Sequence, residues 1–183
     1  KIVDLNDQNL LKAKKLYPGL ILSDDINDII NDKNINAVII ATPVSTHFHL
    51  AKVALNAGKH TLVEKPLAST SEECKILIEL ADRNKLILQV DHIFPYTGAI
   101  GKIKSLFEEK SLGKPLYYDS VRINLGLFQK DVNVIWDLAV HDLSILDYLF
   151  DVEPISLIAN GVAHIKKQKE NIAYLTLNYQ NNF

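Results

Sequence analysis

The sequence predicts an α/β protein in which a doubly wound parallel sheet is followed by a second domain of the α+β class. Up to about residue 90, short apolar runs alternate with segments of helical periodicity, which is typical of a parallel sheet. The run 37–41 is wholly apolar, so we expect a parallel strand buried on both faces. Beyond residue 91, two helices accompany longer alternating runs, which favours an α+β domain. We therefore divide the chain into residues 1–91 and 92–183.

The first two strands and helices are predicted from short local patterns. Residues 1–5 resemble a strand, and residues 6–17 carry apolar side chains at helical spacing until Pro18 and Gly19 end the helix. Residues 21–22 are extended, and Asp24 or Asp25 caps a short helix that runs through Ile30.

Clear start and stop signals mark the next two helices. Ser45 can cap a helix that buries its alanines, and Gly58 stands where a left-handed terminator is expected. The strand at 60–63 follows, and Thr70 with Glu73 has the spacing of a capping box. We expect the buried face of the helix that follows to comprise Cys74, Leu77, Ile78 and Ala81. A strand at residues 86–90 closes the domain.

In the second domain the pattern predicts two helices and three strands. The helices span 96–112, which Gly113 ends, and 137–150. The strands span 115–125, 155–162 and 172–179, and a loop covers 126–134.

Composition excludes several classes of function. The 183 residues are 48% apolar and 23% charged, with a net charge of -2 and a pI near 6.3, so no basic field is available for nucleic acid. No apolar run reaches the 18 or so residues of a membrane span, and we expect a cytoplasmic protein without a membrane partner. The single cysteine, Cys74, cannot form an internal disulfide, and its place on an apolar face favours a core residue over a nucleophile. The chain lacks methionine and ends within an alternating run, so we expect truncation at both ends.

The stretch His60–Pro66 carries the first candidate site. A short strand ends there on Glu64 and Lys65, and ligands of open α/β sheets bind at the carboxyl ends of the strands. Pro66 restricts Lys65 to an extended conformation, which fixes the direction of its ammonium group. The alternative is an ordinary solvated strand exit, because an isolated tripeptide is a weak motif.

Asp137 and His141 form the second candidate site. They lie four residues apart, hence one helical turn from each other, and a carboxylate in that place can orient an acid/base imidazole. Alternatively, Asp137 caps the helix and His141 is a packing residue. A metal site is a third possibility, with His92, Asp91 or His164 as further ligands, although no spacing favours it.

Taken together, these motifs resemble the Gfo/Idh/MocA family of NAD(P)-dependent sugar and cyclitol oxidoreductases. The resemblance covers Lys1 to about Phe150 and rests on five pieces in order: Ala41-Thr42-Pro43 with His47, Ala57-Gly58-Lys59-His60, Glu64-Lys65-Pro66-Leu67, Asp137 and His141. It implies a Rossmann-type first domain from which the first strand and the glycine-rich turn are absent, followed by a mainly antiparallel open sheet.

The resemblance also implies roles for individual residues. Lys65, His141 and Asp137 are the expected catalytic residues, with proton exchange at His141 and electrostatic help from Lys65. The expected cofactor-binding residues are Asp4, Thr42, Pro43, His47, Glu64 and Lys65. Asp4 matches the acid that binds an adenosine ribose, which favours NAD over NADP.

The resemblance implies a substrate class and an oligomeric state. Val134-Ile135-Trp136 replaces a glycine run of the family, and this branch is similar to enzymes of nucleotide-linked sugars in surface polysaccharide synthesis. Candidate sugar contacts, each of which could equally be a surface residue, are Tyr96, Arg122, Asn124 and Gln129. The resemblance implies a homo-oligomer formed through the open face of the second domain's sheet. The competing hypothesis is a non-catalytic dinucleotide-binding or regulatory module of the same fold.

Overall fold

The computed structural model describes residues 1–124, 131–150, 152–165 and 169–180. The chain forms two compact units. The first consists of Lys1–Thr42 and Thr46–Gln89, and the second of Pro43–Ser45 and Val90–Phe183.

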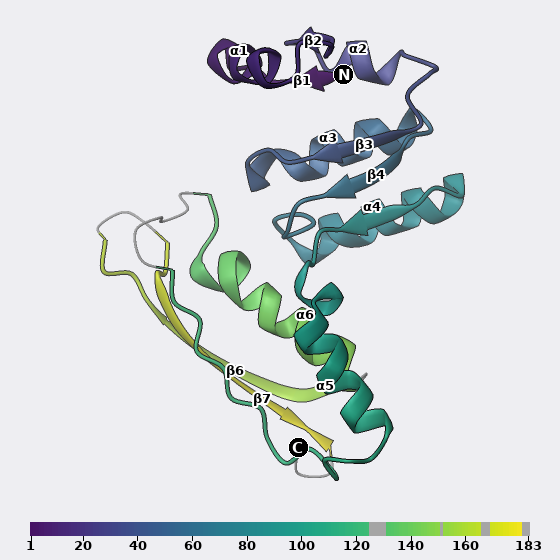
Figure 1. The fold of residues 1–183 in the computed structure, drawn as a ribbon. Coiled ribbons are helices and arrows are strands. Elements are labelled where there is room, and N and C mark those ends of the chain that lie inside the picture. The colour runs from purple at the N-terminus through teal and green to yellow at the C-terminus, as the bar shows by residue number, and fades with distance from the viewer. Residues whose placement is uncertain (125–130, 151, 166–168, 181–183) are drawn as a thin grey trace. The chain divides into compact units, whose positions relative to one another are not determined.

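The first unit alternates strands and helices as expected (Figure 1). Its elements are β1 (Ile2–Val3), α1 (Asp7–Leu16), β2 (Leu22–Ser23), α2 (Asn27–Ile30), β3 (Ala37–Ile40), α3 (Val44–Asn56), β4 (His60–Val63), α4 (Ser71–Asn84) and β5 (Leu88–Val90). β1 pairs with β2 in parallel, and β3 pairs with β4 in parallel. β4 is the middle strand of the sheet β3-β4-β5. The predicted alternation and the parallel pairing are therefore confirmed.

The core of the first unit forms where α3 and α4 pack on the sheet. Its buried members are Val38, Ile40, Ala51, Ala54, Leu55, Val63, Ala68, Leu77, Leu80 and Ala81. Two predictions of burial were wrong. Burial alternates along β3 and leaves Ile39 72% exposed, because these helices cover one face of the strand only. On α4, Leu80 is buried while Ile78 is 49% exposed, because the face turned to the sheet runs through Leu77, Leu80 and Ala81.

Local signals set three of the helix ends in this unit. Asn6 and Thr70 cap α1 and α4 by accepting hydrogen bonds from the N–H groups of Gln8 and Glu73. Gly58 follows α3 with φ of 74°, as a left-handed terminator should. Ser45 is not a cap, because α3 already begins at Val44.

In its described residues, the second unit contains two α-helices, a 3-10 turn, a π-helical turn and a two-stranded antiparallel sheet (Figure 1). The elements are η1 (Phe94–Tyr96), α5 (Gly98–Glu108), the π-helical turn η2 (Ile135–Ala139), α6 (Val140–Phe150), β6 (Pro154–Val162) and β7 (Ile172–Tyr179). β6 and β7 confirm the two predicted strands. They pair with one irregularity in register, between Pro154 and Ser156.

Three predictions for this unit were wrong. α5 ends at Glu108, short of 112, because Lys110 already adopts a positive φ of 58° before Gly113. Residues 115–124 do not form the expected strand; Ser120 and Arg122 instead bind Asp142 on α6, as described below. The helix expected from Asp137 begins earlier, since Asn133 caps it by accepting a hydrogen bond from Trp136 N–H at 3.2 Å. Residues 125–130 of the predicted strand and loop lie outside the described part of the chain.

Candidate functional site

The loops after β3 and β4 form the first candidate site. The strands are in register, with Ile40 opposite Val63, and the N–H of Glu64 donates to the carbonyl of Ile40 at 2.9 Å. Thr42 and Lys65 therefore follow neighbouring parallel strands at the same sheet edge, where α/β sheets bind ligands. Thr42 and Pro43 are exposed, and Glu64 and Lys65 are half-buried.

His47 joins these two loops through hydrogen bonds to their backbone. Its side chain is 1% exposed, Nδ1 lies 2.8 Å from the carbonyl oxygen of Pro66, and Nε2 lies 2.8 Å from that of Thr42. Carbonyl oxygens only accept hydrogen bonds, so a neutral imidazole donates to one of them and a doubly protonated ring donates to both. The ring thus bonds to the backbone of the loops that carry Thr42 and Lys65.

Glu64 and Lys65 stand at the exit of β4. Glu64 Oε2 accepts a hydrogen bond from the backbone N–H of Lys65 at 3.2 Å, and the Lys65–Pro66 peptide bond is cis. The acid thereby orders the backbone that carries the lysine.

Asp4 lies just after β1, where the family resemblance implies a ribose-binding acid. Its carboxylate accepts hydrogen bonds from the N–H of Asn6 at 2.8 Å and from Nδ2 of Asn9 at 2.9 Å. The Asn6 N–H, followed by the Asn9 amide, lowers the pKa of Asp4. Two ionised oxygens offer about four acceptor positions, so the carboxylate can still accept hydrogen bonds from the hydroxyls of a ribose. Its role in cofactor binding stays a prediction.

The second candidate site is on the helix that contains η2 and α6. Asp137 lies in the π-helical turn and His141 in the first turn of α6, and both are half-buried. π-helical turns are rare and occur frequently at functional sites. Asp137 does not cap the helix, so the capping alternative is wrong, while the acid/base roles of both residues stay predictions. Because Lys65 and His141 belong to different units, their convergence on one substrate also stays a prediction.

A polar cluster that the sequence did not predict surrounds Asp142, the next residue along α6. Arg122 donates to its carboxylate through Nε at 2.9 Å and through a terminal nitrogen at 3.1 Å, and Ser120 Oγ donates at 2.8 Å. Burial raises the pKa of Asp142, but the hydrogen bonds of Arg122 and Ser120 and the charge of Arg122 outweigh it, so the pKa lies below its usual value. Neither the position nor the spacing of Ser120, Arg122 and Asp142 indicated this pairing.

The other candidate sugar contacts differ in position. Tyr96 is 80% exposed and Asn124 is exposed, while Gln129 lies outside the described residues. Arg122 is a half-buried partner of Asp142, and its guanidinium carbon lies 4.6 Å from the centre of the Phe94 ring. A role for it in sugar contact stays a prediction.

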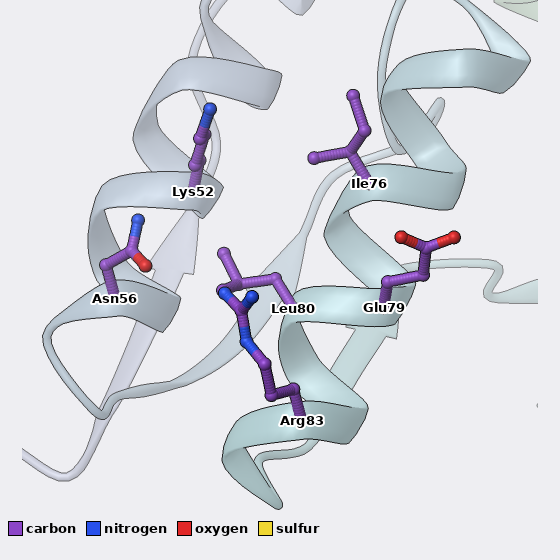
Figure 2. Close-up of a pocket in the computed structure, with 6 residues that line it drawn as sticks. All are labelled: Lys52, Asn56, Ile76, Glu79, Leu80 and Arg83. Atoms are coloured by element: carbon purple, nitrogen blue, oxygen red, sulfur yellow. The ribbon is translucent and has the colours of Figure 1, made fainter.

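Other features of the described chain lie apart from these residues. A groove of about 250 Å³ opens between α3 and α4, and Figure 2 shows its lining: Lys52, Asn56, Ile76, Glu79, Leu80 and Arg83. It contains none of the predicted site residues. Cys74 is half-buried, and burial raises the pKa of its thiol. In the described ranges, no three His, Cys, Asp or Glu side chains gather as a metal site, and no helix is long and apolar enough to span a bilayer.

The order of these elements and the residues at the strand ends match a known family. Residues 1–92 match the GFO_IDH_MocA family, described as an oxidoreductase family with an NAD-binding Rossmann fold. The chain belongs to this family. The expected fold class and the expected resemblance are thereby confirmed, and NAD is the cofactor that the family binds.

The chain is also similar to two named dehydrogenases and to a solved structure. The chain is 37% identical over 148 residues to the UDP-N-acetylglucosamine 3-dehydrogenase of Acidithiobacillus ferrooxidans, covering 79% of this chain and 45% of that protein. It is 28% identical over 180 residues to the inositol 2-dehydrogenase of Azotobacter vinelandii, covering 91% and 53%. A crystal structure of an NAD-binding protein from Listeria innocua has a TM-score of 0.83 at 25% identity and covers 98% of this chain and 55% of that one. The chain thus spans about half the length of these relatives.

Proposed function

We propose that the full-length protein is an NAD-dependent dehydrogenase that acts on a hydroxyl-bearing carbon of a sugar, with a nucleotide-linked sugar as the substrate class. The observation that carries the proposal is the edge of the β3-β4-β5 sheet, where Thr42 and Lys65 follow adjacent parallel strands in a family that binds NAD. The relatives named above act on UDP-N-acetylglucosamine and on inositol, both of which carry secondary hydroxyls.

In this proposal Lys65, His141 and Asp137 each have one role in the chemistry. Bound NAD supplies the acceptor of the hydride that leaves the substrate carbon. The Lys65 ammonium lies at the oxygen of that carbon and stabilises the negative charge that grows there as the proton leaves. His141 accepts the hydroxyl proton on a ring nitrogen, and Asp137 orients the imidazole. In the reverse direction His141 returns the same proton to the oxygen.

The proposal predicts that Lys65→Ala and His141→Asn each lower turnover in the full-length protein by about a hundredfold or more, the usual range for an acid/base group. The assay follows NADH absorbance with UDP-N-acetylglucosamine, free sugars and inositol as substrates. Lys75→Ala and His49→Ala are matched controls, because both side chains are exposed on helices of the first unit. NADH fluorescence titration shows whether the variants still bind cofactor.

Two results would contradict the proposal. Turnover of both site variants within a few fold of the original protein would remove Lys65 and His141 from the chemistry. Tight NADH binding without turnover on any member of the panel would favour the non-catalytic module instead.

Three finer expectations belong to the proposal as well: a cytoplasmic location, a place in polysaccharide synthesis, and self-association through the second unit's sheet. The last has structural support, because every residue of β6 is exposed, including Ile155, Leu157 and Ile158. The mass of the full-length protein in solution tests it.

A further inference from the structure

An unbroken series of side-chain contacts connects His141 to its sequence neighbour Asp142 by way of two other segments. The ring centres of Phe94 and His141 are 4.9 Å apart with an interplanar angle of 74°, an edge-to-face pair. The guanidinium carbon of Arg122 is 4.6 Å from the centre of the same Phe94 ring. Arg122 in turn holds Asp142 with two hydrogen bonds. Because all four residues belong to the second unit, these contacts form within a single compact body.

We propose that Phe94 is a positioning residue for His141, and that the Arg122–Asp142 ion pair holds the Phe94 ring in place. This inference rests on the proposed function of His141 as the acid/base residue. An edge-to-face contact restricts rotation of the imidazole, since the attraction depends on the angle between the rings. A guanidinium over the aromatic ring is attracted to its face and restricts Phe94 in the same way.

The geometry at Asp142 makes Arg122 a rigid support. The pair is bidentate, so the guanidinium plane is fixed by two nearly parallel bonds to the carboxylate. Ser120 donates to Oδ1 at 2.8 Å and Tyr118 to the same oxygen at 3.4 Å. The exposed fractions of the Arg122 and Asp142 side chains are 26% and 19%, which limits screening by water. Residues 118–122 are thus held on α6 by side chains, without strand pairing.

Phe94 and Arg122 both come from segments outside α6, so a shift of either would reach the imidazole through the Phe94 ring. η1, which contains Phe94, packs against α6. A misplacement of about 1 Å can cost a reaction about a hundredfold in rate even when the changed residue touches no substrate. The sequence hypothesis that Arg122 binds the sugar predicts something else: a higher KM from changes at Arg122, and no effect of Phe94.

The test uses the full-length protein and the variants Phe94→Leu and Arg122→Lys. Leucine keeps an apolar side chain but has no ring, and lysine keeps the charge but cannot form the bidentate pair. Phe107→Leu is the matched control, because Phe107 also makes an edge-to-face pair, with Phe150 at 5.3 Å. We expect Phe94→Leu to lower kcat by ten- to a hundredfold while the affinity for NADH changes less than twofold. We expect Phe107→Leu to keep kcat within threefold.

The double variant Phe94→Leu/Arg122→Lys separates a connected series from independent roles. If Arg122 acts through Phe94, the double variant is no slower than Phe94→Leu alone, because the contact is already lost. Effects on kcat that multiply, or a Phe94→Leu variant that behaves like Phe107→Leu, would overturn the proposal. A KM effect of Arg122→Lys with unchanged kcat would assign Arg122 to the sugar instead.

A spectroscopic readout keeps the inference testable even if no substrate is turned over. The ring current of Phe94 affects the NMR chemical shifts of the proton and carbon atoms of the His141 imidazole. We expect Phe94→Leu and Arg122→Lys both to shift them, and Phe107→Leu to leave them in place. Unshifted His141 signals in Arg122→Lys would overturn the support role of the ion pair. Absence of turnover in the original protein, with these shifts present, would count against the proposed function alone.

Discussion

His47 determines how two strand ends are held together. Its buried ring bonds to the backbone of Thr42 and Pro66, which follow β3 and β4. The family motif assigns His47 to the cofactor, but both ring nitrogens of His47 bond to the protein backbone. We infer that His47 affects cofactor binding through the loops that carry Thr42 and Lys65.

His47→Ala removes the ring that lies between the two carbonyl oxygens, leaves at least one of them without its donor, and opens a cavity at the loops. A buried polar group without a partner costs about 1–3 kcal/mol, so we expect the free energy of unfolding to fall by about 2 kcal/mol or more. Urea denaturation followed by circular dichroism measures it. His49→Ala on the same helix is the control, because His49 is exposed, and we expect it to change stability by less than about 0.5 kcal/mol. Equal effects of the two substitutions would show that the two contacts contribute nothing to stability.

The types of the candidate residues were predictable from the sequence, and their contacts were not. Lys65 and Glu64 occupy the strand exit that the pattern predicted, because a strand followed by an X-Pro pair is a local signal. Arg122 and Asp142 form an ion pair although they lie 20 residues apart in the sequence, and the rings of Phe94 and His141 are in contact although they lie 47 residues apart. Such contacts depend on how separate elements pack, and a spacing rule within one helix does not contain that information.

At the scale of elements, α4 shows how a cap acts. Thr70 Oγ1 accepts a hydrogen bond from Glu73 N–H at 3.1 Å, and the side chain of Glu73 accepts one from Ser69 N–H at 3.0 Å. We expect Thr70→Ala to lower the free energy of unfolding by about 1 kcal/mol, because the Glu73 N–H loses its partner. Urea denaturation tests this, with Ser71→Ala as the control. A loss for Ser71→Ala as large as that for Thr70→Ala would mean that the cap is not what stabilises the start of α4.

Elements defined by local chemistry were predicted well. The cap at Thr70 and the terminator Gly58 act within three or four residues, and β6 and β7 are consecutive strands along the chain. Residues 115–124 alternate like a strand but bind α6 through Ser120 and Arg122 instead. Alternation predicts which side chains share a face, whereas a strand also requires a partner, which the sequence does not specify.

At the scale of the whole chain, the order of the elements determined the fold class. A crossover helix must connect parallel strands, so the succession of short apolar runs and helices in residues 1–90 left few alternatives to a parallel sheet. The order of the elements did not predict whether both faces of β3 are buried. Ile39 is 72% exposed although the strand reads as apolar throughout, because the apolar run gives no information on which helices cover each face.

The last prediction concerns the preference of the first unit for NAD over NADP. If the first unit selects the cofactor, Asp4→Ser should raise the use of NADP relative to NAD, because the carboxylate no longer repels a 2'-phosphate. The serine hydroxyl can still accept from Asn6 N–H, so the loop keeps one of its two bonds. We expect the ratio of kcat/KM for NAD to that for NADP to fall by about tenfold, equivalent to about 1.4 kcal/mol.

Asp7→Ser is the control: it removes an equal charge from the first turn of α1 and should leave the ratio within twofold. His141→Asn should lower turnover with both cofactors equally, since it acts in the second unit. An unchanged ratio in Asp4→Ser would remove Asp4 from the cofactor site, and a changed ratio in Asp7→Ser would show that net charge alone sets the preference.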